Sequence, residues 1–184
     1  GFGAVKAKIG AGVDADRRAI ERMRAAGDGM VLMADANQAY DPAAAAEVAA
    51  AAAGAGLAWL EEPLAADRLG DYAALRIAAR LPIAGGETIV SRRDARRWIE
   101  AGAVDVLQPD LCLAGGLETA VAISDAAADA DVVVAPHCYG LGLGLAASLH
   151  WASVIVGSDR AGAAVWIEVD TAPHPARDAL LAGC

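Results

Sequence analysis

The stretch Leu57-Ala58-Trp59-Leu60-Glu61-Glu62-Pro63 (LAWLEEP) decides the fold. A short apolar run ends here in two adjacent carboxylates, and such runs are typical of parallel strands that are covered on both faces. Carboxylates are costly to bury, so a pair of them at the end of a buried strand indicates a function. We expect Glu61 to face the functional side. Glu62 should point the other way, toward solvent or a basic group, and Pro63 should end the strand.

Six further strand-like runs recur at nearly even intervals along the chain. They cover residues 4–9, 30–35, 82–87, 104–110, 132–137 and 165–168. Helical patterns are predicted between them, at residues 14–26, from Pro42 onward with Asp41 as N-cap, and at 67–80, 91–101 and 117–130. Strand and helix alternate seven times, which indicates a parallel α/β sheet.

Two architectures fit this alternation, an open doubly wound sheet and a closed (β/α)8 barrel. No glycine-rich phosphate loop follows the run at 4–9, which favours the barrel. Seven strands are predicted where a barrel has eight, so we expect an incomplete barrel whose first strand lies upstream of Gly1. The predicted organisation is one partial barrel domain over 1–184, with a tail from residue 170.

Composition excludes several classes of protein. The chain has 184 residues, of which 57% are apolar, so disorder is not expected, and its net charge of −9 argues against a nucleic-acid surface. The alanine-rich stretch around 42–60 is too weakly apolar for a membrane span, and no signal peptide is visible. Cys112, Cys138 and Cys184 fit neither a disulfide framework nor a zinc site, so a cytoplasmic location is expected.

A chemically active side chain stands at or near the end of every predicted strand. After Lys6 and Lys8 on the first strand, successive separations from Lys8 are 27, 26, 26, 23, 27 and 31 residues, about one strand–helix unit each. In a barrel these strand ends converge on one mouth, where active sites lie. The six later residues are Asp35, Glu61, Glu87, Asp110, His137 and Glu168.

Asp35, Glu61 and Glu87 form the first group in this set. Singly, each acid could be the N-cap of the next helix. Three carboxylates meeting at one mouth would repel each other unless a cation lies between them. Because all the ligand atoms are oxygen, the pattern predicts a Mg²⁺ site.

The remaining residues suggest acid–base chemistry. Lys6 and Lys8 face one side of their strand, and two buried ammonium groups so close together should depress each other's pKa, which suits a general base. Asp110 and His137 predict a second acid–base pair, and Glu168 could hydrogen-bond to the substrate. A cation and Lys6 would bind a substrate carboxylate and stabilise an enediolate, while Lys8 or His137 removes the α-proton.

The motifs resemble the enolase superfamily, in particular its mandelate racemase/muconate lactonizing enzyme branch, over nearly the whole chain. The resemblance implies that Asp35, Glu61 and Glu87 bind Mg²⁺, that Lys6, Lys8, Asp110, His137 and Glu168 are catalytic, and that Asn37 contacts a substrate hydroxyl. It rests on KAKIG at 6–10, DANQ at 35–38, WLEEP at 59–63, GE at 86–87, QPD at 108–110 with GG at 115–116, PH at 136–137 and WIE at 166–168.

The Asp110–His137 pair resembles the mandelate racemase subgroup, because the segment at 107–112 lacks the lysine of other subgroups. The implied function is acid-sugar dehydration, with 2-hydroxy acid racemisation as the alternative, acting on a small carboxylate without nucleic acid or membrane. Relatives carry an N-terminal capping domain that is absent from this sequence, and a homo-oligomer is expected at full length. A truncated barrel that binds metal or a partner without turnover is a further alternative.

Overall fold

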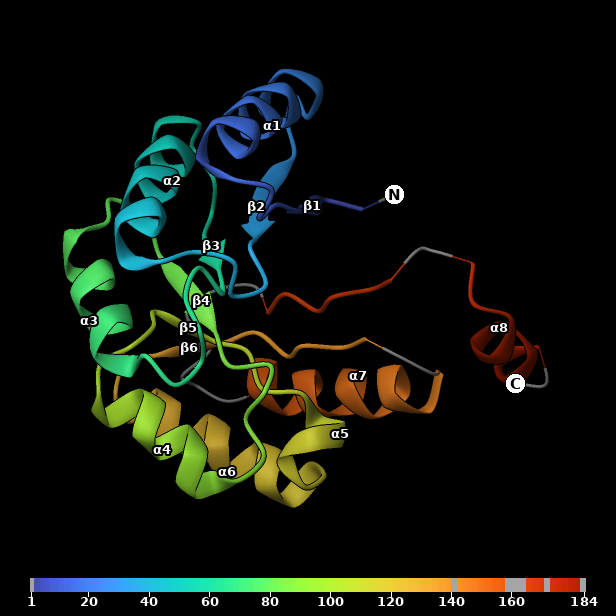
Figure 1. Cartoon of the computed structure of the whole chain (residues 1–184). Coiled ribbons are helices and arrows are strands. Elements are labelled where there is room, and N and C mark those ends of the chain that lie inside the picture. Colours follow the sequence, from blue (N-terminus) through green and yellow to red (C-terminus); the bar gives the residue numbers. More distant parts are fainter. Residues whose placement is uncertain (1, 140–141, 158–164, 171–172, 183–184) are drawn as a thin grey trace. The chain divides into compact units, whose positions relative to one another are not determined.

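The computed structural model describes residues 2–139, 142–157, 165–170 and 173–182, where strands and helices alternate (Figure 1). The strands of this part of the chain are β1 (Ala4–Lys8), β2 (Val31–Asp35), β3 (Leu60–Glu61), β4 (Ile83–Gly85), β5 (Val106–Leu107) and β6 (Val133–Val134). The helices are α1 (Val13–Ala26), α2 (Pro42–Gly54), α3 (Leu69–Ala78), α4 (Arg92–Glu100), α5 (Leu111–Ala114), α6 (Leu117–Ala128), α7 (Gly142–Gly157) and α8 (Pro175–Leu181).

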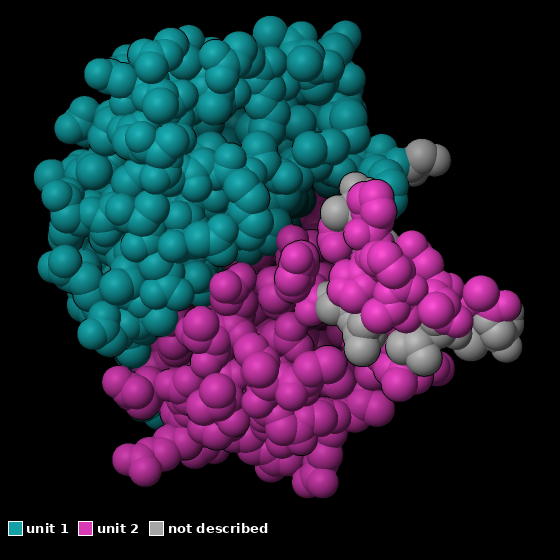
Figure 2. Space-filling model, turned by 45° about the vertical axis from the view of Figure 1, so that its right-hand side comes forward, with its two compact units in different colours: residues 1–85, 100–106 teal, residues 86–99, 107–184 magenta. Residues whose placement is uncertain are grey.

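The sheet follows the order of the sequence, from β1 to β6, and strands β1 to β4 pair in parallel. Parallel neighbours joined by helices are the barrel-type α/β arrangement that the sequence predicts, here as an incomplete barrel. The chain divides into two compact units, which Figure 2 colours teal and magenta. Unit 1 comprises residues 1–85 and 100–106, and unit 2 comprises residues 86–99 and 107–184.

In unit 1, the register of the strands brings their carboxyl ends to one level. Lys8 pairs with Asp35, Asp35 with Glu61, and Glu61 with Ala84. Residues more than twenty positions apart in sequence therefore meet at one edge of the sheet, which is the edge where parallel α/β proteins carry their sites.

Helix α2 shows how an alanine-rich sequence suits this unit. The Asp41 side chain accepts a hydrogen bond from the backbone N–H of Ala44 at 2.9 Å, and Pro42 occupies the first turn, as predicted. Small side chains let the helix pack closely against its neighbours α1 and α3. The buried residues of α2 are Ala45, Val48, Ala49 and Ala52.

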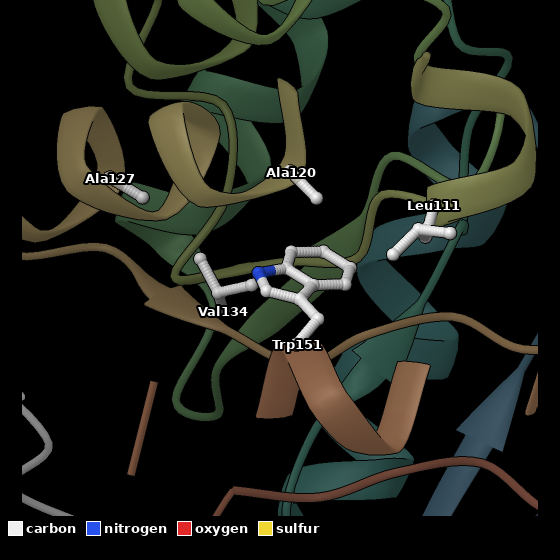
Figure 3. Packing of buried hydrophobic residues seen from close by; sticks show 5 residues of the cluster. All are labelled: Leu111, Ala120, Ala127, Val134 and Trp151. Atoms are coloured by element: carbon white, nitrogen blue, oxygen red, sulfur yellow. The ribbon is translucent and has the colours of Figure 1, made fainter. Parts of the chain in front are cut away.

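Trp151 of α7 is the centre of the apolar core in unit 2 (Figure 3). Its ring is fully buried among Leu111 of α5, Ala120 and Ala127 of α6, and Val134 of β6. The indole Nε1–H donates to Ser124 Oγ at 2.9 Å, so the polar edge of the ring is satisfied inside the core.

The prediction of a seventh strand at residues 165–168 is wrong, because the segment 165–170 forms no strand in the structure. A strand requires a ladder of hydrogen bonds with a neighbour, and none joins this segment to β6 among the described residues. The other predicted strands are present, although β3, β5 and β6 are reduced to two residues each.

Helix α7 is not among the helices that the sequence predicts. Its sequence, GLGLAASLHWASVIVG, contains no Asp, Glu, Lys or Arg, and His150 is its only titratable side chain. Its apolar residues lie all around the helix. The 3.6-residue alternation that identifies an amphipathic helix is therefore absent. Among the described residues, none of the helices is both long enough and apolar enough to cross a bilayer.

Candidate active site

Two buried carboxylates occupy the ends of β2 and β3 in unit 1. Asp35 is fully buried and Glu61 is 1% exposed. Lys6 Nζ lies 2.5 Å from Glu61 Oε1 and 3.7 Å from Asp35 Oδ2, and Lys8 Nζ donates to the same Asp35 oxygen. Both ammonium groups thus reach one carboxylate from the same side of β1, and they balance the negative charge that burial would otherwise make costly.

The burial expected for the two lysines is correct for one of them only. The Lys6 side chain is 13% exposed, whereas that of Lys8 is 60% exposed. Lys8 is the last residue of β1, where the strand meets solvent, and this position explains the difference. The Lys8 amine is therefore open to a molecule that arrives from solution.

Each carboxylate has a second contact that fixes its orientation. Asp35 Oδ1 accepts the backbone N–H of Asn37 at 2.8 Å, and Glu61 Oε2 accepts the indole N–H of Trp59 at 3.3 Å. Asn37 itself is exposed in the loop that follows β2, with its backbone in the left-handed region. The structure thus places the predicted substrate-binding residue directly beside Asp35.

Unit 2 contains an imidazole–carboxylate pair. Asp110 and His137 form an isolated parallel bridge, and His137 Nδ1 lies 3.0 Å from Asp110 Oδ2. The other Asp110 oxygen accepts the backbone N–H of Cys112 at 2.7 Å, which caps α5 and fixes the carboxylate. A carboxylate on Nδ1 holds the ring orientation and leaves Nε2 for exchange with a ligand.

Two further acids face the second nitrogen of this imidazole. His137 Nε2 lies 3.3 Å from Glu87 Oε2 and 3.6 Å from Glu168 Oε2. Burial by itself lowers the pKa of His137, but the hydrogen bond to Asp110 and the charges of Glu168 and Glu87 outweigh it, so the pKa is raised. Burial by itself raises the pKa of Asp110. The hydrogen bonds from His137 and from the Cys112 backbone N–H outweigh this effect, so the pKa of Asp110 is lowered.

Sequence reasoning was wrong about Glu62. Its side chain is 1% exposed, so it does not face solvent, and it accepts a hydrogen bond from Gln38 Nε2 at 2.9 Å. A second acid directly after a buried strand is the signal that could have indicated a buried polar partner.

A second contact between loops was also missed. Tyr40 Oη donates to Asp16 Oδ2 at 2.7 Å, and both residues are buried. Asp16 also accepts the backbone N–H of Gly12 at 2.9 Å, so the loop after Lys8 and the loop after Asp35 are tied to each other. No single residue type in the sequence indicates this contact, because its partners are 24 positions apart. Cys112 and Cys138 are free thiols, and Cys184 lies outside the described residues.

Comparison with known proteins gives a consistent result. The family model for enolase C-terminal domain-like proteins matches residues 1–179. The D-galactarolactone cycloisomerase of Agrobacterium fabrum (strain C58 / ATCC 33970) is 43% identical over 152 residues, which are 82% of this chain and 40% of that protein.

Solved structures with the same fold include a mandelate racemase/muconate lactonizing enzyme from Bordetella bronchiseptica RB50. Its TM-score is 0.89 at 35% identity, over 98% of this chain and 49% of that one. L-talarate dehydratase from Polaromonas sp. JS666, complexed with Mg and L-glucarate, has a TM-score of 0.78 at 31% identity, over 92% of this chain and 45% of that one. The chain spans about half the length of these relatives or less. It belongs to the family of enolase C-terminal domain-like proteins.

Proposed function

We propose that this chain carries the catalytic part of a magnesium-dependent enzyme that removes the α-proton of an acid-sugar carboxylate. The observation that carries the proposal is the pair of buried carboxylates, Asp35 and Glu61, aligned in register at adjacent strand ends with the amines of Lys6 and Lys8 on them. Two adjacent buried acids are costly to hold in a fold, and their retention is explained by a ligand that needs them.

Asp35, Glu61 and Glu87 are the residues that would hold the cation. Asp35 and Glu61 are buried and Glu87 is half-buried, and all three offer carboxylate oxygen, which Mg²⁺ prefers. Glu87 follows Ala84 by three residues, and Ala84 pairs with Glu61 in the sheet. When bound, the ion would supply positive charge beside the substrate carboxylate, where negative charge builds up as the proton leaves. A solved relative that contains Mg supports this assignment.

Lys8 and His137 are the proposed acid–base groups. The exposed Lys8 amine would take the α-proton, and Lys6 would contact the substrate carboxylate. His137, oriented by Asp110, would hold or deliver a proton at Nε2. Asn37, exposed beside Asp35, would bind a substrate hydroxyl, and Glu168 would hydrogen-bond to a carboxylate oxygen when protonated.

Dehydration is the reaction that we favour. The α-carbon–hydrogen bond breaks with transfer of the proton to Lys8, and the β-carbon–oxygen bond breaks with the hydroxyl leaving as water after it receives a proton from His137. The resulting enol rearranges to a 2-keto acid. The likeness to L-talarate dehydratase supports this choice.

An isomerase is the second candidate, because the D-galactarolactone cycloisomerase match covers 82% of this chain. A racemase with Lys8 and His137 on opposite faces of the α-carbon would use the same groups. In either isomerase, a proton removed from the substrate is returned and no water leaves, so the products separate the candidates.

The test uses the protein expressed from its complete reading frame, with Mg²⁺ and a library of acid sugars, their lactones and 2-hydroxy acids. A 2-keto acid that has lost one molecule of water relative to its substrate indicates the dehydratase. An isomer of the substrate, or α-deuterium incorporation from D₂O without loss of water, indicates an isomerase. Mg²⁺ binding without turnover or exchange on any compound would favour the non-catalytic module. Absence of both binding and turnover would contradict the proposal. Location in the cytoplasm and assembly as a homo-oligomer remain predictions.

A further inference from the structure

The loop that follows Asp35 is bound along its length to the chain that follows β3. Three backbone amides of this loop donate to successive carbonyls of the Glu61-Glu62-Pro63 segment. The hydrogen bonds are Ala36 N to Glu61 O at 2.9 Å, Gln38 N to Glu62 O at 2.7 Å and Tyr40 N to Pro63 O at 3.1 Å. The ladder of the sheet therefore continues beyond the strands.

The backbone in these two segments is strained. Asn37 has φ of 42° and Gln38 has φ of 65°, and across from them Glu62 has φ of 40°. Residues other than glycine rarely adopt these angles, and they keep them only where the surrounding contacts hold them. From Ala36 to Tyr40, two residues of the loop lie opposite each residue of the segment after β3, as in a β-bulge. The residues with left-handed angles lie within this stretch.

The Gln38 side chain makes the contacts that hold this conformation. Its Nε2 donates to Glu62 Oε2 at 2.9 Å, and its Oε1 accepts the backbone N–H of Ala66 at 3.1 Å. The Glu62 side chain is 1% exposed, so this hydrogen bond is made away from water, where its loss is most costly. Both ends of the amide are therefore used to join the loop after β2 to the loop after β3.

We propose that Gln38 and Glu62 form a latch that positions Asp35 and Asn37 for the bound cation and the substrate, an inference that rests on the proposed function above. The path is short. Asn37, whose backbone N–H donates to Asp35 Oδ1 at 2.8 Å, directly precedes Gln38, and both residues have left-handed backbone angles. The backbone N–H groups of Ala36 and Tyr40 tie the two ends of this loop to Glu61 and Pro63, so a return of residues 37 and 38 to ordinary backbone angles must rotate the peptides between these points. That rotation would weaken the Asn37 N–H hydrogen bond to Asp35 and move the Asn37 side chain. Gln38 and Glu62 are thus positioning residues, and neither needs to touch the substrate.

The test compares Gln38→Ala with Glu62→Gln in the protein expressed from its complete reading frame. Mg²⁺ alone is titrated calorimetrically, without substrate. Loss of a group that orients a ligand typically weakens metal affinity about 10–100-fold, and we expect a change of that size in the Gln38→Ala dissociation constant. Glu62→Gln keeps an oxygen that accepts from Gln38, so it should bind Mg²⁺ close to the parent value.

A matched control separates positioning from general loss of stability. Ser124→Ala removes the part-buried hydrogen bond to Trp151 at the core of unit 2. This variant should unfold at a lower temperature than the parent and keep the parent affinity for Mg²⁺. In metal-free protein, the Asn37 amide should exchange with solvent faster in Gln38→Ala than in the parent or in Ser124→Ala. If Gln38→Ala does not fold, Gln38→Met, which has similar length and cannot form these hydrogen bonds, replaces it.

The outcomes distinguish the two proposals. A parent protein that binds no Mg²⁺ overturns the proposed function and the latch with it. A parent that binds, together with a Gln38→Ala variant of equal affinity and equal Asn37 protection, overturns the latch alone. Weak binding by Glu62→Gln to the same degree as Gln38→Ala also contradicts the latch, because it would show that the carboxylate charge matters rather than the hydrogen bond.

Discussion

The two units carry chemically different groups of the predicted site residues. In unit 1, the carboxylates of Asp35 and Glu61 are at most 1% exposed, lie at the ends of paired strands and contact lysine amines. In unit 2, His137 is surrounded by acids whose side chains are 11–25% exposed, and its main partner, Asp110, lies beyond the end of a two-residue strand. The first arrangement pairs buried carboxylates with ammonium groups, and in the second the acids around one imidazole raise its pKa. Burial with charge pairing thus distinguishes Asp35 and Glu61 from the more exposed acids around His137.

The largest effect should come from removal of the base. Lys8→Ala is expected to slow α-proton exchange of an acid sugar in D₂O by about 10²–10⁴-fold, the usual contribution of a positioned acid or base. The Lys8 side chain is 60% exposed but its amine contacts the buried Asp35 carboxylate, so the variant should fold with some loss of stability. Nuclear magnetic resonance of the substrate measures the exchange, and thermal denaturation checks the fold.

His137→Gln sharpens this test across the two units. A dehydratase should lose product formation in this variant and retain α-proton exchange, since Lys8 still removes the proton. A racemase should also lose product formation, and only the stereoisomer whose α-proton faces Lys8 should still exchange that proton with solvent. Full exchange in Lys8→Ala would contradict the role of Lys8, whatever the His137 variant does.

A smaller effect is expected from the buried charge pair of unit 1. Glu61→Gln leaves the Lys6 amine, which is 13% exposed, without its carboxylate, and breaking a buried pair from one side costs about 3–5 kcal/mol. The free energy of unfolding, measured with urea in the presence of a chelator, should fall by about 3 kcal/mol. The amide that replaces the carboxylate can still accept from Lys6, which keeps the loss at the lower end.

The matched control is Glu118→Gln, which removes the exposed pair with Arg92. Both partners of this pair face solvent, and such pairs contribute little to stability. We expect no measurable change in unfolding. Equal losses in the Glu61 and Glu118 variants would show that burial does not distinguish the strand-end acids.

The sequence predicts which strand-end residues of unit 1 lie side by side, for a physical reason. A strand–helix unit of nearly constant length repeats there, so a separation of 26 or 27 residues places Lys8, Asp35 and Glu61 on adjacent strands. Parallel pairing then determines the register, and side-chain alternation determines which residues face the same side. The predicted N-cap at Asp41 is also confirmed, because capping depends only on the residues of the first helical turn.

What the sequence missed depends on contacts that carry no periodic signal. Helix α7 is apolar on every side, so no face is marked by polar residues. The predicted strand at 165–168 has the right composition, yet composition does not supply a ladder partner. The Gln38–Glu62 contact joins residues 24 positions apart through backbone angles that are unusual for either residue. Strain of this kind becomes visible only when the loops are placed.

The smallest predicted effect is a dependence of stability on pH that comes from the Asp110–His137 pair. The raised pKa of His137 means that the folded protein favours the imidazolium, so its stabilisation is complete below the unfolded value of about 6.5 and is lost as pH rises through the folded pKa. The lowered pKa of Asp110 means that its stabilisation is present above the unfolded value of about 3.8 and is lost as pH falls through the folded pKa. The pair therefore stabilises most between these two values.

His137→Gln should accordingly destabilise the protein more at pH 5.5 than at pH 8.5, as measured by urea unfolding with a chelator present. Ser124→Ala removes a group that does not titrate, so its cost should be the same at both pH values. A loss in His137→Gln that is equal at both pH values would mean that the ring contributes packing rather than charge. In that case the acids around His137 would not favour its charged form in the folded protein, and the electrostatic contrast between the two units would be lost.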